Sequence, residues 1–140
     1  SLVGFGLAAE LAAKEQADDS ARLGELAEAL LTRLANEVGD VCLNGAGAPR
    51  LTNTLNLRFA GADAEAVMAS MPDVQVSSGS ACQSAVPMPS HVLTAMGISR
   101  QAASESIRIS LGRPTTSEEI QTAAESIAAA VARVRELTTN

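Results

Sequence analysis

A chain of 140 residues has the length of one domain, and folding at this size buries roughly two-thirds of the surface that the unfolded chain exposes. Its 10 basic and 16 acidic residues give a net charge of −6, which argues against a face that binds nucleic acid or an anionic membrane. An apolar fraction of 46% argues against a disordered chain, and no apolar run approaches the ~20 residues of a membrane span.

The reactive residue types are few. The N-terminus shows neither the basic segment nor the uninterrupted apolar stretch of a secretory signal. Cys42 and Cys82 are too few for a disulfide scaffold and lack the spacing of zinc ligands. With one lysine (Lys14), one histidine (His91), no tryptophan and no tyrosine, the chain offers little for Schiff-base chemistry or aromatic stacking. We therefore expect a soluble cytoplasmic protein without a metal site.

Two helices are predicted before residue 40. Apolar residues four apart line one face of a helix over residues 3–17. Asp18–Ser20 are residues typical of turns or helix caps. From there, apolar residues every three or four positions predict a second helix that runs to about Val38 and ends at Gly39.

Strands are predicted where apolar and polar residues alternate or where short apolar runs occur. Leu51–Phe59 predicts a strand with Leu51 and three later residues on its buried face, and Ser106–Leu111 predicts another. Val41–Leu43 and Val74–Val76 are shorter candidates.

Three further helices follow from their caps and apolar spacing. Asp63 caps a short helix that stops at Pro72, and a second short helix ends at Gly97 with Val92, Leu93 and Met96 inward. Thr116–Glu119 forms a capping box for a long C-terminal helix. The element order predicts an α+β fold with a small, largely antiparallel sheet and helices packed on one face.

Cys82 is the first candidate for chemistry. It lies in residues 77–90, the longest stretch without apolar periodicity, and all its neighbours are small or uncharged. Such a segment suits an accessible thiol, although free cysteine is more often buried and inert, so both interpretations stay open. Cys42, inside Val41–Leu43, is predicted to be a buried core thiol.

Arg108 is the second candidate because it lies mid-strand, opposite the apolar face. A guanidinium grips a carboxylate through two parallel hydrogen bonds, but a solvated strand face explains the residue as well. Arg113, where that strand ends, has a similar role or forms a salt bridge. His91 is interpreted as a surface residue, and Asn53, on an apolar face, as a residue that fixes a loop.

Several segments, in collinear order over nearly the whole chain, share the pattern of one enzyme family. Val-Ser-Ser-Gly-Ser-Ala-Cys at 76–82 is followed by Pro-Ser-His-Val-Leu at 89–93 and Ser-Ile-Arg-Ile-Ser-Leu-Gly-Arg at 106–113. Leu-Thr-Asn-Thr-Leu-Asn-Leu-Arg-Phe at 51–59 and Val-Gly-Phe-Gly-Leu-Ala-Ala-Glu-Leu at 3–11 precede them. Together they resemble the cysteine desulfurases of the NifS/IscS type, which are class V aminotransferase-like enzymes.

The resemblance implies an enzyme of fold type I that uses pyridoxal 5′-phosphate (PLP) to take sulfur from L-cysteine, leaving L-alanine. It assigns the persulfide-carrying nucleophile to Cys82 and the substrate carboxylate to Arg108, with Arg113 second. The active-site loop would comprise Ser78, Gly79, Ser80 and Ala81. The sulfur would pass to an acceptor protein such as an iron–sulfur scaffold, and the enzyme would be a homodimer.

The resemblance also implies that much of the enzyme is missing. Residues 1–17 would be a remnant of the interdomain helix and residues 18–140 the small C-terminal domain, without the N-terminal PLP-binding large domain. Lys14 does not match the family's cofactor-bearing lysine. We therefore expect this chain alone neither to bind PLP nor to turn over cysteine. We also expect either self-association through its uncovered first helix or disorder before about residue 8. The alternatives are a stand-alone persulfide carrier and a purely structural or interaction domain.

Overall fold

A computed structural model describes residues 1–79 and 90–139. Its sheet has three antiparallel strands in the order β1 (Val41–Leu43), β2 (Thr54–Phe59) and β3 (Ser106–Ser110). The helices are α1 (Leu2–Val38), α2 (Ala64–Ala69), α3 (His91–Ala95), α4 (Arg100–Ser104) and α5 (Ser117–Thr139). The predicted α+β class with a small antiparallel sheet is confirmed.

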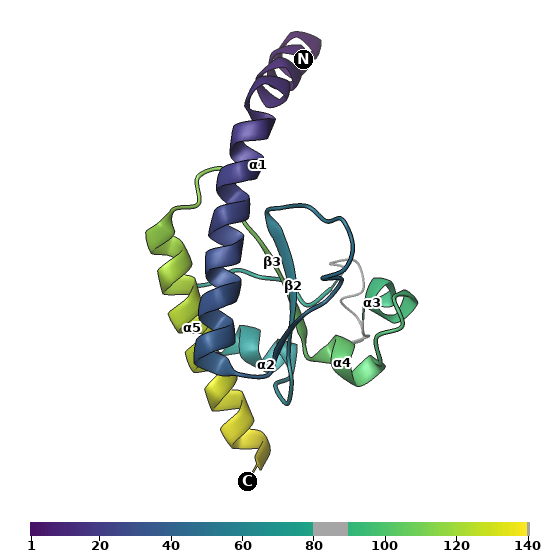
Figure 1. The fold of residues 1–140 in the computed structure, drawn as a ribbon, viewed down its shortest axis with the longest axis vertical. Coiled ribbons are helices and arrows are strands. Elements are labelled where there is room, and N and C mark those ends of the chain that lie inside the picture. The colour runs from purple at the N-terminus through teal and green to yellow at the C-terminus, as the bar shows by residue number, and fades with distance from the viewer. Residues whose placement is uncertain (80–89, 140) are drawn as a thin grey trace.

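The core lies between one face of the sheet and the long helices. Figure 1 shows α1 and α5 side by side on one side of the strands, with α3 and α4 on the opposite side. Alternate residues of β2 and β3 point into this core, which α1, α2 and α5 cover. The fully buried side chains include Leu30, Leu34, Leu55, Leu57, Phe59, Ile107, Ile127 and Val131.

The predicted break between two N-terminal helices is wrong, because α1 is one helix of 37 residues. The polar residues at 18–20 lie along its side and find partners elsewhere in the fold. The Ser20 hydroxyl is 3.0 Å from that of Thr52, and the Asp19 carboxylate lies 2.8 Å from the Arg113 guanidinium. Tertiary contacts therefore override the local preference of these residues for turns.

Several sequence predictions about the caps are confirmed. The Asp63 side chain accepts a hydrogen bond from the Ala66 amide at the start of α2. In the capping box of α5, Thr116 and Glu119 each accept a bond from the other's backbone amide. One helix was not predicted: α4, which Ser99 caps by accepting from the Ala102 amide.

The predicted strand ends need correction. Leu51 was expected on the buried face but is 73% exposed, because a turn closed by the Thr54 amide and the Leu51 carbonyl precedes β2. The predicted strand at 74–76 is absent from the described residues. Instead, Ser77 alone pairs with Arg108 of β3, through two backbone hydrogen bonds.

Two side chains, Val92 of α3 and Met96 at its C-cap, differ from the prediction that they point inward. Leu93 is buried, but Val92 and Met96 are 54% and 51% exposed. A helix of five residues that lies over the polar side of the sheet directs only one of its apolar residues into packed surroundings.

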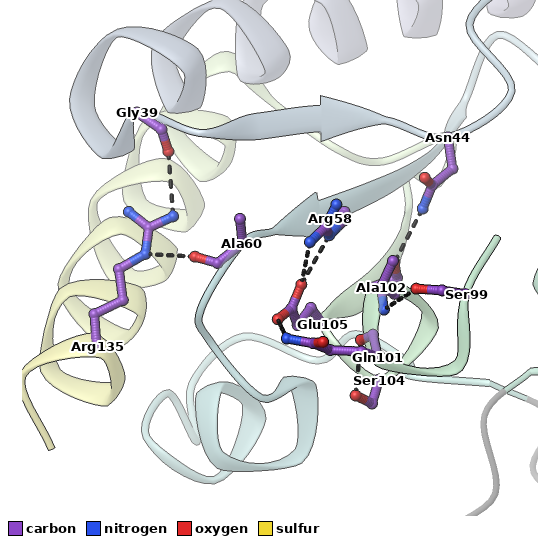
Figure 2. Close-up of polar contacts among 11 residues, drawn as sticks. Gly39, Asn44, Arg58, Ala60, Ser99, Gln101, Ala102, Ser104, Glu105 and Arg135 are labelled. Atoms are coloured by element: carbon purple, nitrogen blue, oxygen red, sulfur yellow. Dashed lines mark hydrogen bonds and ion pairs between the residues drawn. The ribbon is translucent and has the colours of Figure 1, made fainter. Parts of the chain in front are cut away.

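The start of β3 is held by a largely buried ion pair. The Glu105 carboxylate, only 7% exposed, accepts bonds of 2.8 and 2.7 Å from Arg58 on β2, as Figure 2 shows. Burial raises the pKa of Glu105, but hydrogen bonds from Arg58 and the Gly61 backbone, with the charge of Arg58, outweigh it. The net pKa therefore lies below the ordinary value of a glutamate.

We expect Glu105→Gln to lower the free energy of unfolding at neutral pH by about 2 kcal/mol, since Arg58 then loses its charged partner. A carboxylate with a lowered folded-state pKa stabilises the fold above its unfolded-state pKa and loses this contribution as the pH falls through the folded-state pKa. The difference between the two proteins should therefore shrink as the pH falls below the ordinary pKa of a glutamate. Urea unfolding at neutral and at acidic pH measures it, with exposed Glu125→Gln as the control. A difference that grows on acidification would contradict the assignment.

Candidate functional site

A pocket of about 270 Å³ lies on the polar side of the sheet, opposite the core. Its floor comes from β2 and β3, with Thr54, Asn56 and Arg108, and from Asn44, which directly follows β1. Its walls come from α3 and from the two ends of the undescribed segment: Ser78, Gly79, Ser90, His91, Val92, Leu93 and Met96. The pocket thus joins the Arg108 strand to both ends of the segment that contains Cys82.

Arg108 is held rigidly at the floor of this pocket. Its backbone amide and carbonyl both bond Ser77, at 2.6 and 3.1 Å, while its Cα lies opposite that of Asn56 on β2. The guanidinium is exposed and forms no hydrogen bond or ion pair with the described residues. A free guanidinium fixed by a strand is suited to bind an anion, above all a carboxylate, through two parallel bonds.

A chain of hydrogen bonds lies beside Arg108. The buried Ser106 hydroxyl donates to the Ala102 carbonyl at 2.6 Å. Asn44 Nδ2 donates to Ser106 Oγ at 3.0 Å and to Asn56 Oδ1 at 2.7 Å. Figure 2 shows the Asn44 side chain pointing from the end of β1 towards the region of Ala102. This cluster was not predicted from the sequence, because only the strand register brings its members together.

The predicted active-site loop is described in part. Ser78 and Gly79 line the pocket, and the Ser78 hydroxyl donates to a carboxylate oxygen of Glu65 at 2.5 Å. The Ser77 hydroxyl donates to the Gly79 carbonyl at 2.8 Å. Ser80, Ala81 and Cys82 lie outside the described residues.

Arg113 is not at the pocket. Its guanidinium forms ion pairs with Glu15 and Asp19 of α1, and its carbonyl accepts a bond of 2.5 Å from Arg22. Of the two predicted roles for Arg113, the structure therefore shows the salt bridge. These contacts fasten the end of β3 to the middle of α1.

Of the remaining candidate residues, some match the sequence predictions and others do not. Cys42, expected in the core, is exposed, because the alternation of β1 turns Val41 and Leu43 inward and Cys42 outward. Asn53 fixes a loop as predicted: its side chain donates to the Leu111 carbonyl at 3.0 Å. His91 begins α3 and lines the pocket.

Neither a metal centre nor a membrane segment is found in residues 1–79 and 90–139. No three His, Cys, Asp or Glu side chains in these ranges are placed to hold a metal ion. No helix in the same ranges combines the length and the apolar character that crossing a membrane requires.

The pocket, its arginine and the flanking segment can be compared with known proteins. The family model for aminotransferase class V matches residues 1–122. The chain belongs to this family. A cysteine desulfurase from Frankia sp. (strain EuIK1) is 51% identical over 97% of this class V chain. Cysteine desulfurase IscS of Anaeromyxobacter sp. (strain Fw109-5) is 45% identical over the same share.

A solved structure of similar fold supports the same placement. The NifS-like protein from Rickettsia africae ESF-5 superposes with a TM-score of 0.77 at 30% identity and covers 91% of this class V chain. The chain spans about a third of the length of its curated relatives: 33% of the Frankia protein and 34% of the Anaeromyxobacter protein. The predicted relation to NifS/IscS-type enzymes is confirmed.

The described residues do not form a complete site for PLP. Lys14 is the chain's single lysine, and it is exposed on α1, away from the pocket residues. The pocket lining therefore has no amine to hold the cofactor covalently and no acidic side chain to pair with its ring nitrogen. What the pocket lining does offer is a guanidinium without a partner among the described residues and the side-chain amide of Asn56.

Proposed function

We propose that this chain is the small C-terminal domain of a PLP-dependent cysteine desulfurase, in which Arg108 binds the carboxylate of L-cysteine and Cys82 receives its sulfur. The observation that carries the proposal is the Arg108 guanidinium, which has no partner among the described residues and lies in a pocket that Gly79 and Ser90 also line. Covalent geometry keeps the Cα of Cys82 within about 11 Å of the Cα of Gly79, three residues earlier. This short tether supports the proposal that the Cys82 thiol meets a substrate held at Arg108.

The cofactor belongs, in this proposal, to a part of the longer enzyme outside these 140 residues. PLP supplies electron withdrawal from the substrate's amine-bearing carbon when it is bound. This chain supplies the carboxylate grip and the accepting thiol. The sulfur then passes to an acceptor protein, such as an iron–sulfur scaffold, in the cytoplasm; the resemblance of residues 76–82 and 106–113 supports this step.

The alternative interpretations predict different thiol chemistry. A low-molecular-weight persulfide donates its terminal sulfur to a thiolate, so that one S–S bond forms, one breaks and the donor leaves as a thiol. Treating this chain with glutathione persulfide and mapping the product by peptide mass spectrometry should place an added sulfur on Cys82 before Cys42. Loading of neither thiol would favour a structural domain and overturn the proposal. Loading of Cys82 together with an Arg108 that binds no carboxylate would favour a stand-alone carrier.

We further propose that the isolated chain associates through the first turns of α1, and that the longer enzyme is a homodimer. Apolar side chains are exposed there without a covering layer: Leu2, Val3, Phe5, Leu7 and Leu11. An apolar stripe of this kind favours self-association, because burying it removes apolar surface from water.

Replacing Phe5 and Leu7 together by aspartate should therefore convert the isolated chain to a monomer in light scattering. Leu137→Asp is the control, since Leu137 is 75% exposed at the other end of the molecule. An oligomer that survives the double replacement, or a wild-type chain that is already monomeric, would contradict this mode of association.

A further inference from the structure

We propose that Asn56 is a second donor to the substrate carboxylate, and that Asn44 and Ser106 are positioning residues which fix the direction of its amide. The inference rests on the proposed function, since it takes a carboxylate at Arg108 as given. It is carried by the hydrogen-bond chain on the polar side of the sheet and by the strand register.

The donor-to-acceptor direction of this series of hydrogen bonds is set at the Ala102 backbone carbonyl, which can only accept. Because the Ser106 hydroxyl gives its single hydrogen to the Ala102 carbonyl, Ser106 Oγ has only lone pairs left for Asn44. Asn44 must then present its Nδ2 group, which donates to Ser106 at 3.0 Å and to Asn56 at 2.7 Å. Asn56 in turn accepts through Oδ1, so its Nδ2 is the group left over.

This leftover amide group faces the pocket. Asn56 is half-buried and lines the pocket, and its Nδ2 forms no hydrogen bond with the described residues. Every buried side-chain nitrogen or oxygen among these residues has a hydrogen-bond partner. Because Asn56 Nδ2 has none among them, this atom is not buried and is open to the pocket. A pair of N–H donors in that position binds an acceptor, and it repels a cation.

The register places this donor next to Arg108. The two Cα atoms are direct partners across β2 and β3. The amide and carbonyl of Arg108 both point to Ser77, and the Asn56 carbonyl accepts from the Asn44 amide at 2.9 Å. The two residues therefore form a non-hydrogen-bonded pair, the kind whose side chains lie closer together in an antiparallel sheet. A guanidinium and an amide side by side offer donors to both oxygens of one carboxylate.

The test uses the chain itself, with L-alanine as the carboxylate probe and L-alaninamide as the same molecule without a carboxylate. Two-dimensional NMR follows the Nε–H of Arg108 and the Nδ2 hydrogens of Asn56. We expect L-alanine to shift both signals and L-alaninamide to shift neither. Asn56→Ala should weaken L-alanine binding about tenfold, because it removes one bond to a charged group. Ser110→Ala, on the same face of β3 but outside the pocket lining, should change it less than twofold.

A separate variant tests the positioning role of Ser106. Ser106→Ala removes the acceptor that pins Asn44, so Asn56 loses its fixed direction, and L-alanine binding should weaken about threefold although residue 106 touches no ligand. A structural defect alone would not remove the Asn56 signal shift while leaving that of Arg108.

The outcomes separate the two proposals. A shift at Arg108 without one at Asn56, and an unaltered affinity in Asn56→Ala, would overturn the role of Asn56 while the role of Arg108 stands. A lack of response at both residues would overturn the carboxylate site, and with it the proposed function.

Discussion

Replacing Arg108 by alanine in the longer enzyme is expected to lower kcat/KM for L-cysteine about a hundredfold. The guanidinium has no partner among the described residues, so the bound carboxylate would be its first, and two bonds to a charged group are worth about 3 kcal/mol. Arg108→Lys should recover only part of this loss, since an ammonium offers a point charge in place of two parallel N–H groups.

The division of the loss between KM and kcat distinguishes weaker substrate binding from a loss of protein stability. Steady-state measurements should show most of the loss in KM, because the carboxylate is gripped in the ground state as well as in the transition state. Arg100→Ala is the matched control: Arg100 is also an exposed arginine, it begins α4, and it lies outside the pocket lining. An unchanged KM in Arg108→Ala would refute the assigned role.

Replacing Cys82 by serine is expected to reduce sulfur release from L-cysteine in the longer enzyme roughly a thousandfold or more, since a hydroxyl cannot form a persulfide and loss of a nucleophile removes the covalent route. Binding of L-cysteine should be retained, because the Arg108 site is intact. Sulfide release and binding are measured on the same preparation.

Cys42→Ser is the control for this variant. Cys42 is exposed on the edge strand β1, and it is not among the pocket residues. Its replacement should leave the rate within about twofold. An active Cys82→Ser protein together with an inactive Cys42→Ser protein would move the sulfur carrier to β1 and contradict the account.

The elements with strong local signals were predictable. The clean alternation at residues 54–59, the capping box before α5 and the Asp63 cap each determine their own local structure, and the structure confirms them. Asn53 was predictable because a polar residue on an apolar face must find a partner.

The features that were not predicted correctly depend on contacts between distant parts of the chain. Asp19 continues a helix because Arg113, 94 residues later, pairs with it. The exposure of Cys42 follows from the direction in which an edge strand meets β2, which three residues of sequence do not specify. Asn56 is one polar residue of an alternating strand, and only the pairing with β3 places it beside Arg108.

The family motif implied roles for Cys82 and Arg108 that apolar periodicity alone left open. Local composition left Cys82 balanced between a reactive and an inert thiol, and left Arg108 as an ordinary solvated strand residue. The structure adds that Arg108 faces a pocket without a partner among the described residues, and that Gly79 and Ser90 border the same pocket. These two observations support the role proposed for Arg108.

The most direct measurement follows the sulfur atom from its source. The longer enzyme is incubated with ³⁵S-labelled L-cysteine, quenched with an alkylating agent that traps persulfides, digested and mapped. We predict that the label resides on the peptide containing Cys82, is released by a reducing thiol and is absent from the Arg108→Ala protein at low substrate. Label on Cys42, or protein without label while alanine accumulates, would contradict a sulfur-carrying role for this domain.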